Sequence, residues 1–182
     1  MKHTLLIITA LLFITSTVIP QSKMNINNLV EYGDKKYKPN DDESYTGKVF
    51  DFYENGQKKL DGSYRKGLMN GKWTYYHENG QIYVQGRFIN GDGSYPDDYP
   101  DSFKSISPPF DGRSGKWTEW WPNGQKRYAG TLKDGIPDGL ITSWYENGQK
   151  ESEITYKDGE VISGKCWDEV GNEIDCDDFL GQ

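Results

Sequence analysis

The sequence has few of the residues that usually carry out catalysis or bind metals. It contains 182 residues but only two histidines and two cysteines. There is no Gly-x-Ser-x-Gly elbow to accompany His77, no phosphate-binding glycine loop, no dinucleotide fingerprint and no His/Cys cluster with metal spacing. Carboxylates are plentiful, but Glu54, Glu78 and Glu146 each come directly before a turn, where solvated acidic residues are common. We therefore expect no catalytic residues, no cofactor and no metal site, and interpret the chain as non-enzymatic.

Long hydrophobic runs are also missing, apart from one at the N-terminus. Residues 4–19 are uncharged and mostly apolar, and they follow the positively charged start Met1-Lys2-His3. This run is shorter than the roughly 20 residues that a membrane-spanning helix needs. A charged start and a short apolar run are typical of a signal peptide. We assign residues 1–22 to it and expect a secreted, periplasmic or cell-envelope protein, with an uncleaved anchor as the alternative.

The sequence contains no cluster of basic residues. Its 21 Lys and Arg residues are outnumbered by 28 Asp and Glu residues, which gives a net charge of −7. A negative charge of this size opposes binding to nucleic acid phosphates and to anionic lipid surfaces. We therefore expect neither nucleic acid nor an anionic membrane surface as a partner.

What the sequence does contain is an internal repeat of 23 to 24 residues. Four copies of an Asn-Gly-Gln motif have their glycines at 56, 80, 124 and 148, and a degenerate copy has its glycine at 171. An aromatic residue precedes each of these glycines by four positions; these residues are Phe52, Tyr76, Trp120, Trp144 and Trp167. A second turn motif closes each of the first four units, at Lys66-Gly67, Asn90-Gly91, Asp134-Gly135 and Asp158-Gly159. A fixed period of this kind is the mark of a repeat architecture.

Asn-Gly between segments rich in aromatic and β-branched residues predicts a hairpin with a two-residue type I′ turn. That turn places Trp73 opposite Gly86 and Trp117 opposite Gly130, and a Trp ring lying over a strand glycine covers its bare backbone. It also pairs two aromatic residues with lysines, namely Trp121 with Lys126 and Tyr145 with Lys150. The predicted fold class is therefore all-β: an elongated repeat array of antiparallel β-hairpins that forms a single twisted sheet.

The repeat resembles a known family. The segment from Tyr53 to Trp73 reads Tyr-x-Asn-Gly-Gln, then Gly-x-Tyr-x-x-Gly, then Asn-Gly-Lys-Trp. These motifs are similar to the MORN-repeat variant found in YwqK-type antitoxins, and the likeness extends over about residues 47–176. The resemblance implies a MORN-like β-hairpin array that binds a partner, which in an antitoxin is a toxin.

Three segments depart from the repeat. Residues 23–46 read as an N-terminal capping segment before the repeats of residues 47–182, and residues 92–113 form an acidic, proline-containing insertion that we expect to be a loop. Part of this loop spaces oxygen-bearing side chains like a calcium loop; these are Asn90, Asp92, Ser94, Asp98 and Asp101. Tyr95, however, stands where a calcium loop needs glycine, so a plain solvated loop is the alternative.

The two cysteines, Cys166 and Cys176, lie five residues before and five residues after Gly171. A three-residue loop at Val170-Gly171-Asn172 would place them across from each other in a hairpin, whereas a two-residue turn would shift the pair by one. Exported proteins form disulfides readily. We expect a Cys166–Cys176 disulfide.

The remaining hypotheses concern binding. We expect a protein-protein binding or scaffolding module of the cell envelope, with an antitoxin-like role and glycan binding as alternatives. The candidate binding surface consists of Trp120, Trp121, Trp144 and Tyr145, because exposed aromatic side chains anchor both protein partners and sugar rings. Packing of these rings between repeats is the competing interpretation.

Overall fold

The computed structural model describes residues 23–95 and 108–176. The expected signal peptide, the middle of the insertion and residues 177–182 lie outside the described residues. Within the described part, no helix is long and apolar enough to span a membrane. The one helical element there is the short 3-10 helix η1 (Ile26–Asn28).

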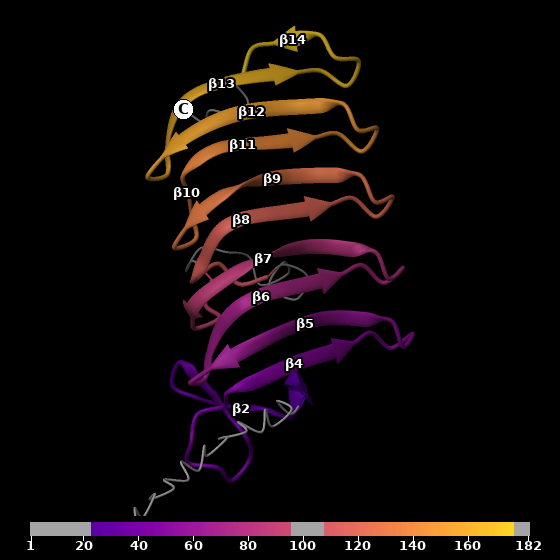
Figure 1. Cartoon of the computed structure of the whole chain (residues 1–182). Helices are drawn as coiled ribbons and strands as arrows, with labels where there is room; N and C mark the ends of the chain where they lie inside the picture. Colours follow the sequence, from indigo (N-terminus) through magenta and orange to yellow (C-terminus); the bar gives the residue numbers. More distant parts are fainter. Residues whose placement is uncertain (1–22, 96–107, 177–182) are drawn as a thin grey trace, which may run out of the picture.

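Almost every other element is a strand, which confirms the all-β repeat array. One 12-stranded sheet has the order β1-β4-β5-β6-β7-β8-β9-β11-β12-β13-β14, with β10 pairing β9 at the side, and β2 and β3 form a separate hairpin. The strands lie side by side, across the long axis of an elongated, twisted sheet (Figure 1). Their bounds are β1 Lys23–Asn25, β2 Val30–Tyr32, β3 Lys35–Tyr37, β4 Gly47–Phe52, β5 Lys58–Arg65, β6 Leu68–Tyr76, β7 Ile82–Gly91, β8 Arg113–Trp120, β9 Lys126–Lys133, β10 Ile136–Pro137, β11 Gly139–Trp144, β12 Lys150–Lys157, β13 Glu160–Trp167 and β14 Glu173–Ile174.

The Asn-Gly turns differ from the predicted type I′ turn. In the third unit the amide of Gly124 donates to the carbonyl of Trp121 (2.8 Å), and the amide of Trp121 donates to the carbonyl of Gln125 (2.8 Å). Gly124 has a φ of +86°, while Asn123 is not among the residues with positive φ. This is a three-residue loop, a type I turn followed by a glycine bulge. Type I′ geometry occurs instead at three of the second turns, as at Asp134 (φ +49°) and Gly135 (φ +80°), whereas Gly91 of the Asn90-Gly91 turn is not among the residues with positive φ.

The extra loop residue shifts the register beside the turn. Trp120, and not Trp121, pairs with Lys126. In the next unit Trp144, and not Tyr145, pairs with Lys150. Both lysine pairings predicted from the sequence are therefore wrong by one residue, because they assumed a two-residue loop.

Farther from the turn the predicted register is confirmed, with Trp73 opposite Gly86 and Trp117 opposite Gly130. The rings, however, do not cover these glycines. A Cβ added to Gly62 would overlap the Trp73 ring, and one added to Gly86 would overlap the Trp117 ring. Each indole thus covers the glycine of the preceding unit and joins two neighbouring hairpins.

Side chains alternate between two faces of the sheet. The face that carries the buried hydrophobic residues, which include Val49, Trp73, Phe88, Trp117 and Ile141, is called the core face. The opposite face is called the open face. At the N-terminal edge of the sheet, the short strand β1 pairs in parallel with β4.

The last hairpin carries the predicted disulfide, between Cys166 and Cys176. The loop here is Glu169-Val170-Gly171, since the amide of Asp168 donates to the carbonyl of Asn172 (2.9 Å). Cys166 consequently pairs with Ile174 in the ladder, and Cys176 lies two residues beyond that partner. Both cysteines are buried.

Candidate functional site

The recurring Asn-Gly-Gln residues connect neighbouring turns. In the third turn the Asn123 carboxamide accepts from the amide of Gln125 (2.9 Å) and donates to the carbonyl of Glu146 in the next turn (2.8 Å). The same bond to the next turn is made by Asn55, Asn79 and Asn147. The series ends at Val170, which has no carboxamide to continue it. The motif that identified the repeat is therefore explained by structure and does not by itself form a site.

A second series of hydrogen bonds uses the side chain three residues before each turn glycine. Tyr53 Oη donates to the carbonyl of Tyr76 (2.6 Å), Trp121 Nε1 to that of Trp144 (2.9 Å) and Tyr145 Oη to that of Trp167 (2.9 Å). His77 is the fourth member, with Nε2 2.9 Å from the carbonyl oxygen of Trp120. A carbonyl only accepts, so Nε2 carries the proton. These side chains hold one unit to the next.

The four residues of the predicted binding surface therefore lie on two faces. Trp121 lies on the core face, where the Arg127 guanidinium stands 4.6 Å from its ring centroid. Tyr145 occupies the equivalent position one unit later. Trp120 and Trp144 lie on the open face. All four side chains are partly buried, but they do not form one platform.

Trp120 and Trp144 belong to a longer line of rings on the open face. Each unit contributes one ring, and the two-strand step puts neighbouring rings about 9.6 Å apart. The line, called here the aromatic stripe, consists of Phe52, Tyr76, Trp120, Trp144 and Trp167. Phe52 is 48% exposed and the other rings are partly buried.

Lysines lie between the rings of this stripe. The Nζ atoms of Lys58, Lys126 and Lys150 stand 5.6, 5.6 and 5.2 Å from the ring centroids of Tyr76, Trp144 and Trp167. A cation at this distance is attracted by the ring quadrupole, with a contribution of about 0.5–1 kcal/mol at an exposed site. The stripe thus alternates aromatic rings with lysine side chains.

A row of cations runs beside the stripe, and it was not predicted from the sequence. Each of its members lies next to a buried core residue in the chain and points to the open face; they are Lys48, Lys72, Arg87 and Lys116. All four are exposed. Lys72 lies directly opposite Arg87 on the neighbouring strand. We call these four residues the basic row.

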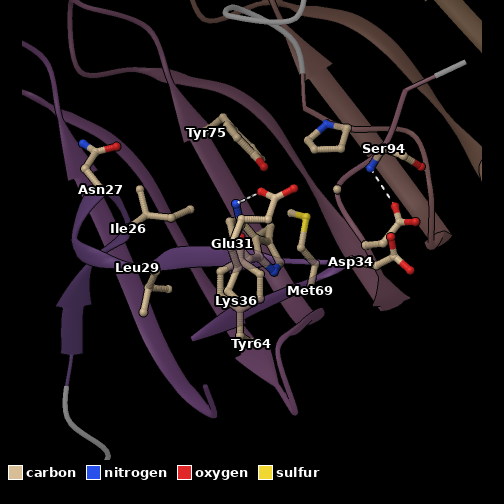
Figure 2. A pocket seen from close by; sticks show the side chains of 14 residues that line it. Ile26, Asn27, Leu29, Glu31, Asp34, Lys36, Tyr64, Met69, Tyr75 and Ser94 are labelled. Carbon is tan, nitrogen blue, oxygen red and sulfur yellow. Dashed lines mark hydrogen bonds and ion pairs between the residues drawn. The ribbon is translucent and has the colours of Figure 1, made fainter. Parts of the chain in front are cut away.

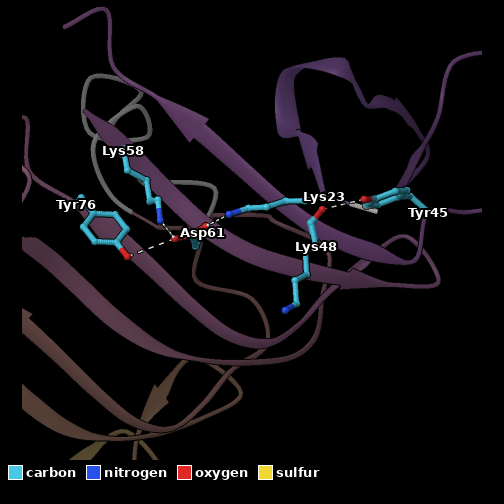
Figure 3. Close-up of polar contacts among 6 residues, drawn as sticks. All are labelled: Lys23, Tyr45, Lys48, Lys58, Asp61 and Tyr76. Atoms are coloured by element: carbon cyan, nitrogen blue, oxygen red, sulfur yellow. Dashed lines mark hydrogen bonds and ion pairs between the residues drawn. The ribbon is translucent and has the colours of Figure 1, made fainter. Parts of the chain in front are cut away.

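Two acidic residues of the open face, Asp61 and Glu153, are already paired with lysines. Asp61 lies 2.9 Å from Lys23 Nζ and 2.7 Å from Lys58 Nζ, and Tyr76 Oη donates to it at 3.4 Å (Figure 3). Burial raises the pKa of Asp61, but hydrogen bonds from Lys23 and Lys58 outweigh burial and hold it below its usual value. Toward the other end of the sheet, Glu153 lies 2.6 Å from Lys150 Nζ. Neither carboxylate is available to neutralise the basic row.

The core face carries two adjoining open grooves, between η1 and the described ends of the insertion. The larger one, of about 1250 Å³, is lined by Tyr53, Tyr83 and Arg127 among others. The smaller one, of about 560 Å³, lies over Tyr64 and Met69 (Figure 2). Both are lined by Ile26 and Pro109, and Tyr75 lies where the two meet. The grooves form because the N-terminal capping segment and the described ends of the insertion lie over the core face of the sheet.

The cations that line these grooves are paired with carboxylates. Arg127 is bonded to Glu119 (2.7 Å) and Lys59 lies 3.8 Å from Asp51. Burial raises the pKa of Glu119, and Arg127 opposes that shift. Burial also lowers the pKa of Arg113, which donates through Nε to the carbonyl of Pro109 (2.7 Å). The grooves therefore offer no unpaired cation among their lining residues, whereas lining carboxylates such as Asp34 and Glu54 belong to no ion pair of the described residues.

The calcium-like spacing is described only in part, because Asp98 and Asp101 lie outside the described residues. Asp92 Oδ1 accepts from the amide of Ser94 (2.7 Å), and Asn90 Oδ1 accepts from Asn70 (3.3 Å). These oxygens are bonded within the chain. Over residues 23–95 and 108–176, no three His, Cys, Asp or Glu side chains are grouped closely enough to hold a metal ion.

Comparison with known proteins identifies the repeat. A search of curated proteins finds no match to this chain. The family described as "MORN repeat variant" matches residues 45–66, 69–90, 113–134 and 137–158. Each matched segment runs from the start of one of the first four hairpins to its second turn, and the hairpin with the disulfide falls outside them. The chain therefore contains four MORN repeat variants.

Proposed function

We propose that this chain is an exported, non-catalytic scaffold of the cell envelope and that a partner protein docks on the open face of its sheet. The observation that carries the proposal is the aromatic stripe, in which every unit places one ring at the same position on one face. Trp and Tyr are enriched among the residues that dominate binding energy at protein interfaces. The matched repeats support a protein as the partner.

Other residues of the repeat serve the array itself. Asn123 and its equivalents connect the turns, and Trp121 and His77 connect the units. Trp120 and Trp144 make no such hydrogen bonds through their indole nitrogens within the described part of the chain. Docking of a partner would explain why an aromatic ring recurs at the position of Trp120 and Trp144.

The test is chemical cross-linking of the purified protein in envelope extract. Trp120→Ala combined with Trp144→Ala should remove the cross-linked adduct, because two central rings of the stripe are lost. Tyr32→Ala is the matched control, since Tyr32 is 81% exposed on the separate β2-β3 hairpin. Far- and near-ultraviolet circular dichroism shows that each variant is folded.

The outcomes separate the alternatives. An adduct that persists in the double tryptophan variant excludes the open face as the docking surface. A toxin as the captured partner would assign the antitoxin-like role, and a change of Trp fluorescence with soluble polysaccharide would instead favour glycan binding. Export is tested by fractionating cells that express the full chain, and a wholly cytoplasmic location contradicts it.

A further inference from the structure

We infer that the partner presents an acidic surface, which the basic row binds beside the aromatic stripe; this inference rests on the proposed function. The row crosses β4, β6, β7 and β8, so that cations from residues up to 68 positions apart in the sequence meet on one face. Lys48, Lys72 and Lys116 follow the first glycine of their repeats, which gives the row the same period as the fold. The fourth repeat has Leu140 at this position, so the row ends before β11.

The arrangement of these cations costs stability. Lys72 and Arg87 are directly opposite each other in an antiparallel pair, where like charges destabilise a sheet. No carboxylate of the described residues pairs with any member of the row, since Lys48, Lys72, Arg87 and Lys116 are absent from every ion pair within 4.0 Å. An acidic surface from outside the chain would relieve this repulsion.

The residues between the Lys72–Arg87 pair and the aromatic stripe are uncharged. Thr74 and Gln85 lie opposite each other beside the Lys72–Arg87 pair, and Gln85 donates to Thr74 Oγ1 (2.9 Å). Thr118 lies opposite Gln85 on the other side, between Lys116 and Trp120 along β8. The middle of the open face is therefore a basic and polar strip next to aromatic rings. Electrostatic complementarity with an acidic surface gives such an interface its specificity and association rate.

An acidic protein surface fits this face better than other polyanions do. The basic row lies on a sheet surface, whereas the grooves of the chain lie on the core face. Single-stranded nucleic acid is bound in positively charged grooves that follow its backbone.

The test uses fluorescein-labelled poly-L-glutamate as a defined acidic polypeptide, titrated with the full chain at low ionic strength and followed by fluorescence anisotropy. The test variant combines Lys72→Gln, Arg87→Gln and Lys116→Gln. The control variant combines Lys35→Gln, Lys38→Gln and Lys66→Gln, three exposed cations that lie on none of the strands of the row. Both variants lose three positive charges, so they differ only in where the charges were.

We expect the affinity for poly-L-glutamate to fall on the order of tenfold in the test variant and to change less than about twofold in the control. The melting temperature of the test variant should stay the same or rise, because the Lys72–Arg87 repulsion is gone. This second measurement separates loss of a binding surface from loss of structure. Equal weakening in both variants, or no weakening in either, overturns the inference.

Two further comparisons test the identity of the occupant and separate this inference from the proposed function. Tighter binding of single-stranded DNA or of phosphatidylserine vesicles than of poly-L-glutamate at the same salt concentration would overturn an acidic protein as the occupant. If the partner adduct is lost in the Trp120/Trp144 variant but kept in the test variant, the proposed function stands and the acidic surface does not. Loss of the adduct in both variants, with the control unaffected, supports both.

Discussion

The indole ring of Trp117 lies against Gly86 of the preceding hairpin, so closely that a Cβ at residue 86 would overlap the ring. The guanidinium carbon of Arg113 stands 4.8 Å from the centroid of the same ring. Trp117 is 2% exposed and Phe88 is 0% exposed, and the two rings meet edge to face at 5.1 Å. Contact between hairpins in the middle of the array thus depends on a glycine that leaves room for an indole.

Gly86→Ala should therefore destabilise the protein. The added methyl group has to displace the Trp117 ring in a packed core, and overpacking of this kind costs about 1–3 kcal/mol. Urea unfolding of the two proteins measures the difference. Gly164→Ala is the control, because Gly164 is an exposed strand glycine of the last unit, and we expect it to change the free energy of unfolding by less than about 0.5 kcal/mol. Similar costs at both positions would contradict the packing argument.

Asn123→Ala should weaken the contact between the third and fourth turns. It removes the acceptor for the Gln125 amide and the donor to the Glu146 carbonyl, and two such bonds at the surface are worth about 1–2 kcal/mol together. Thermal or urea unfolding gives the value. Glu146→Ala leaves that backbone carbonyl in place and should have little effect. If Asn123→Ala left the free energy of unfolding unchanged, water would be replacing both hydrogen bonds without cost, and the prediction would be wrong.

The repeat period was enough to predict the hairpins, their number and the register far from the turns. It did not predict the turn type, because Asn-Gly suits both a type I′ turn and a type I turn with a glycine bulge. The choice accompanies a contact between units, in which Asn123 bonds to its own turn and to the next one. Local sequence gives no information about such a contact, so the pairing of Trp121 with Lys126 was off by one residue.

The candidate site was predicted less well for a related reason. Trp120 and Trp121 are neighbours in the sequence but lie on opposite faces, so grouping them by proximity joined two different surfaces. Lys48, Lys72 and Lys116 are 24 and 44 residues apart, and a search for local basic clusters does not find them. A search within the repeat columns would have found these three lysines, while Arg87 joins the row only through strand pairing.

The pH dependence of stability should reveal the Asp61 ion pairs. The pKa of Asp61 is lower in the folded protein than its usual value of 3.8, so the carboxylate stabilises the fold above that value. This stabilisation should be lost as the pH falls through the lowered folded pKa. Asp61→Asn removes it, so the difference in free energy of unfolding between the two proteins should be constant near neutral pH and shrink in acid. A difference that stays constant down to pH values below the folded pKa would contradict the linkage.

Reduction of the Cys166–Cys176 disulfide should loosen the last hairpin. The bond closes a loop of 10 residues in the unfolded chain, which corresponds to about 2–3 kcal/mol on the chain-entropy model. Urea unfolding with and without dithiothreitol measures this contribution, and Cys166→Ser combined with Cys176→Ser should make stability independent of the reductant. Because β14 pairs with β13 through only two residue pairs, the loss should fall mainly on this end of the sheet. Hydrogen exchange should then rise in β13 and β14 and stay unchanged in β6 and β7, whereas two titratable thiols in the unreduced protein would show that the bond is absent.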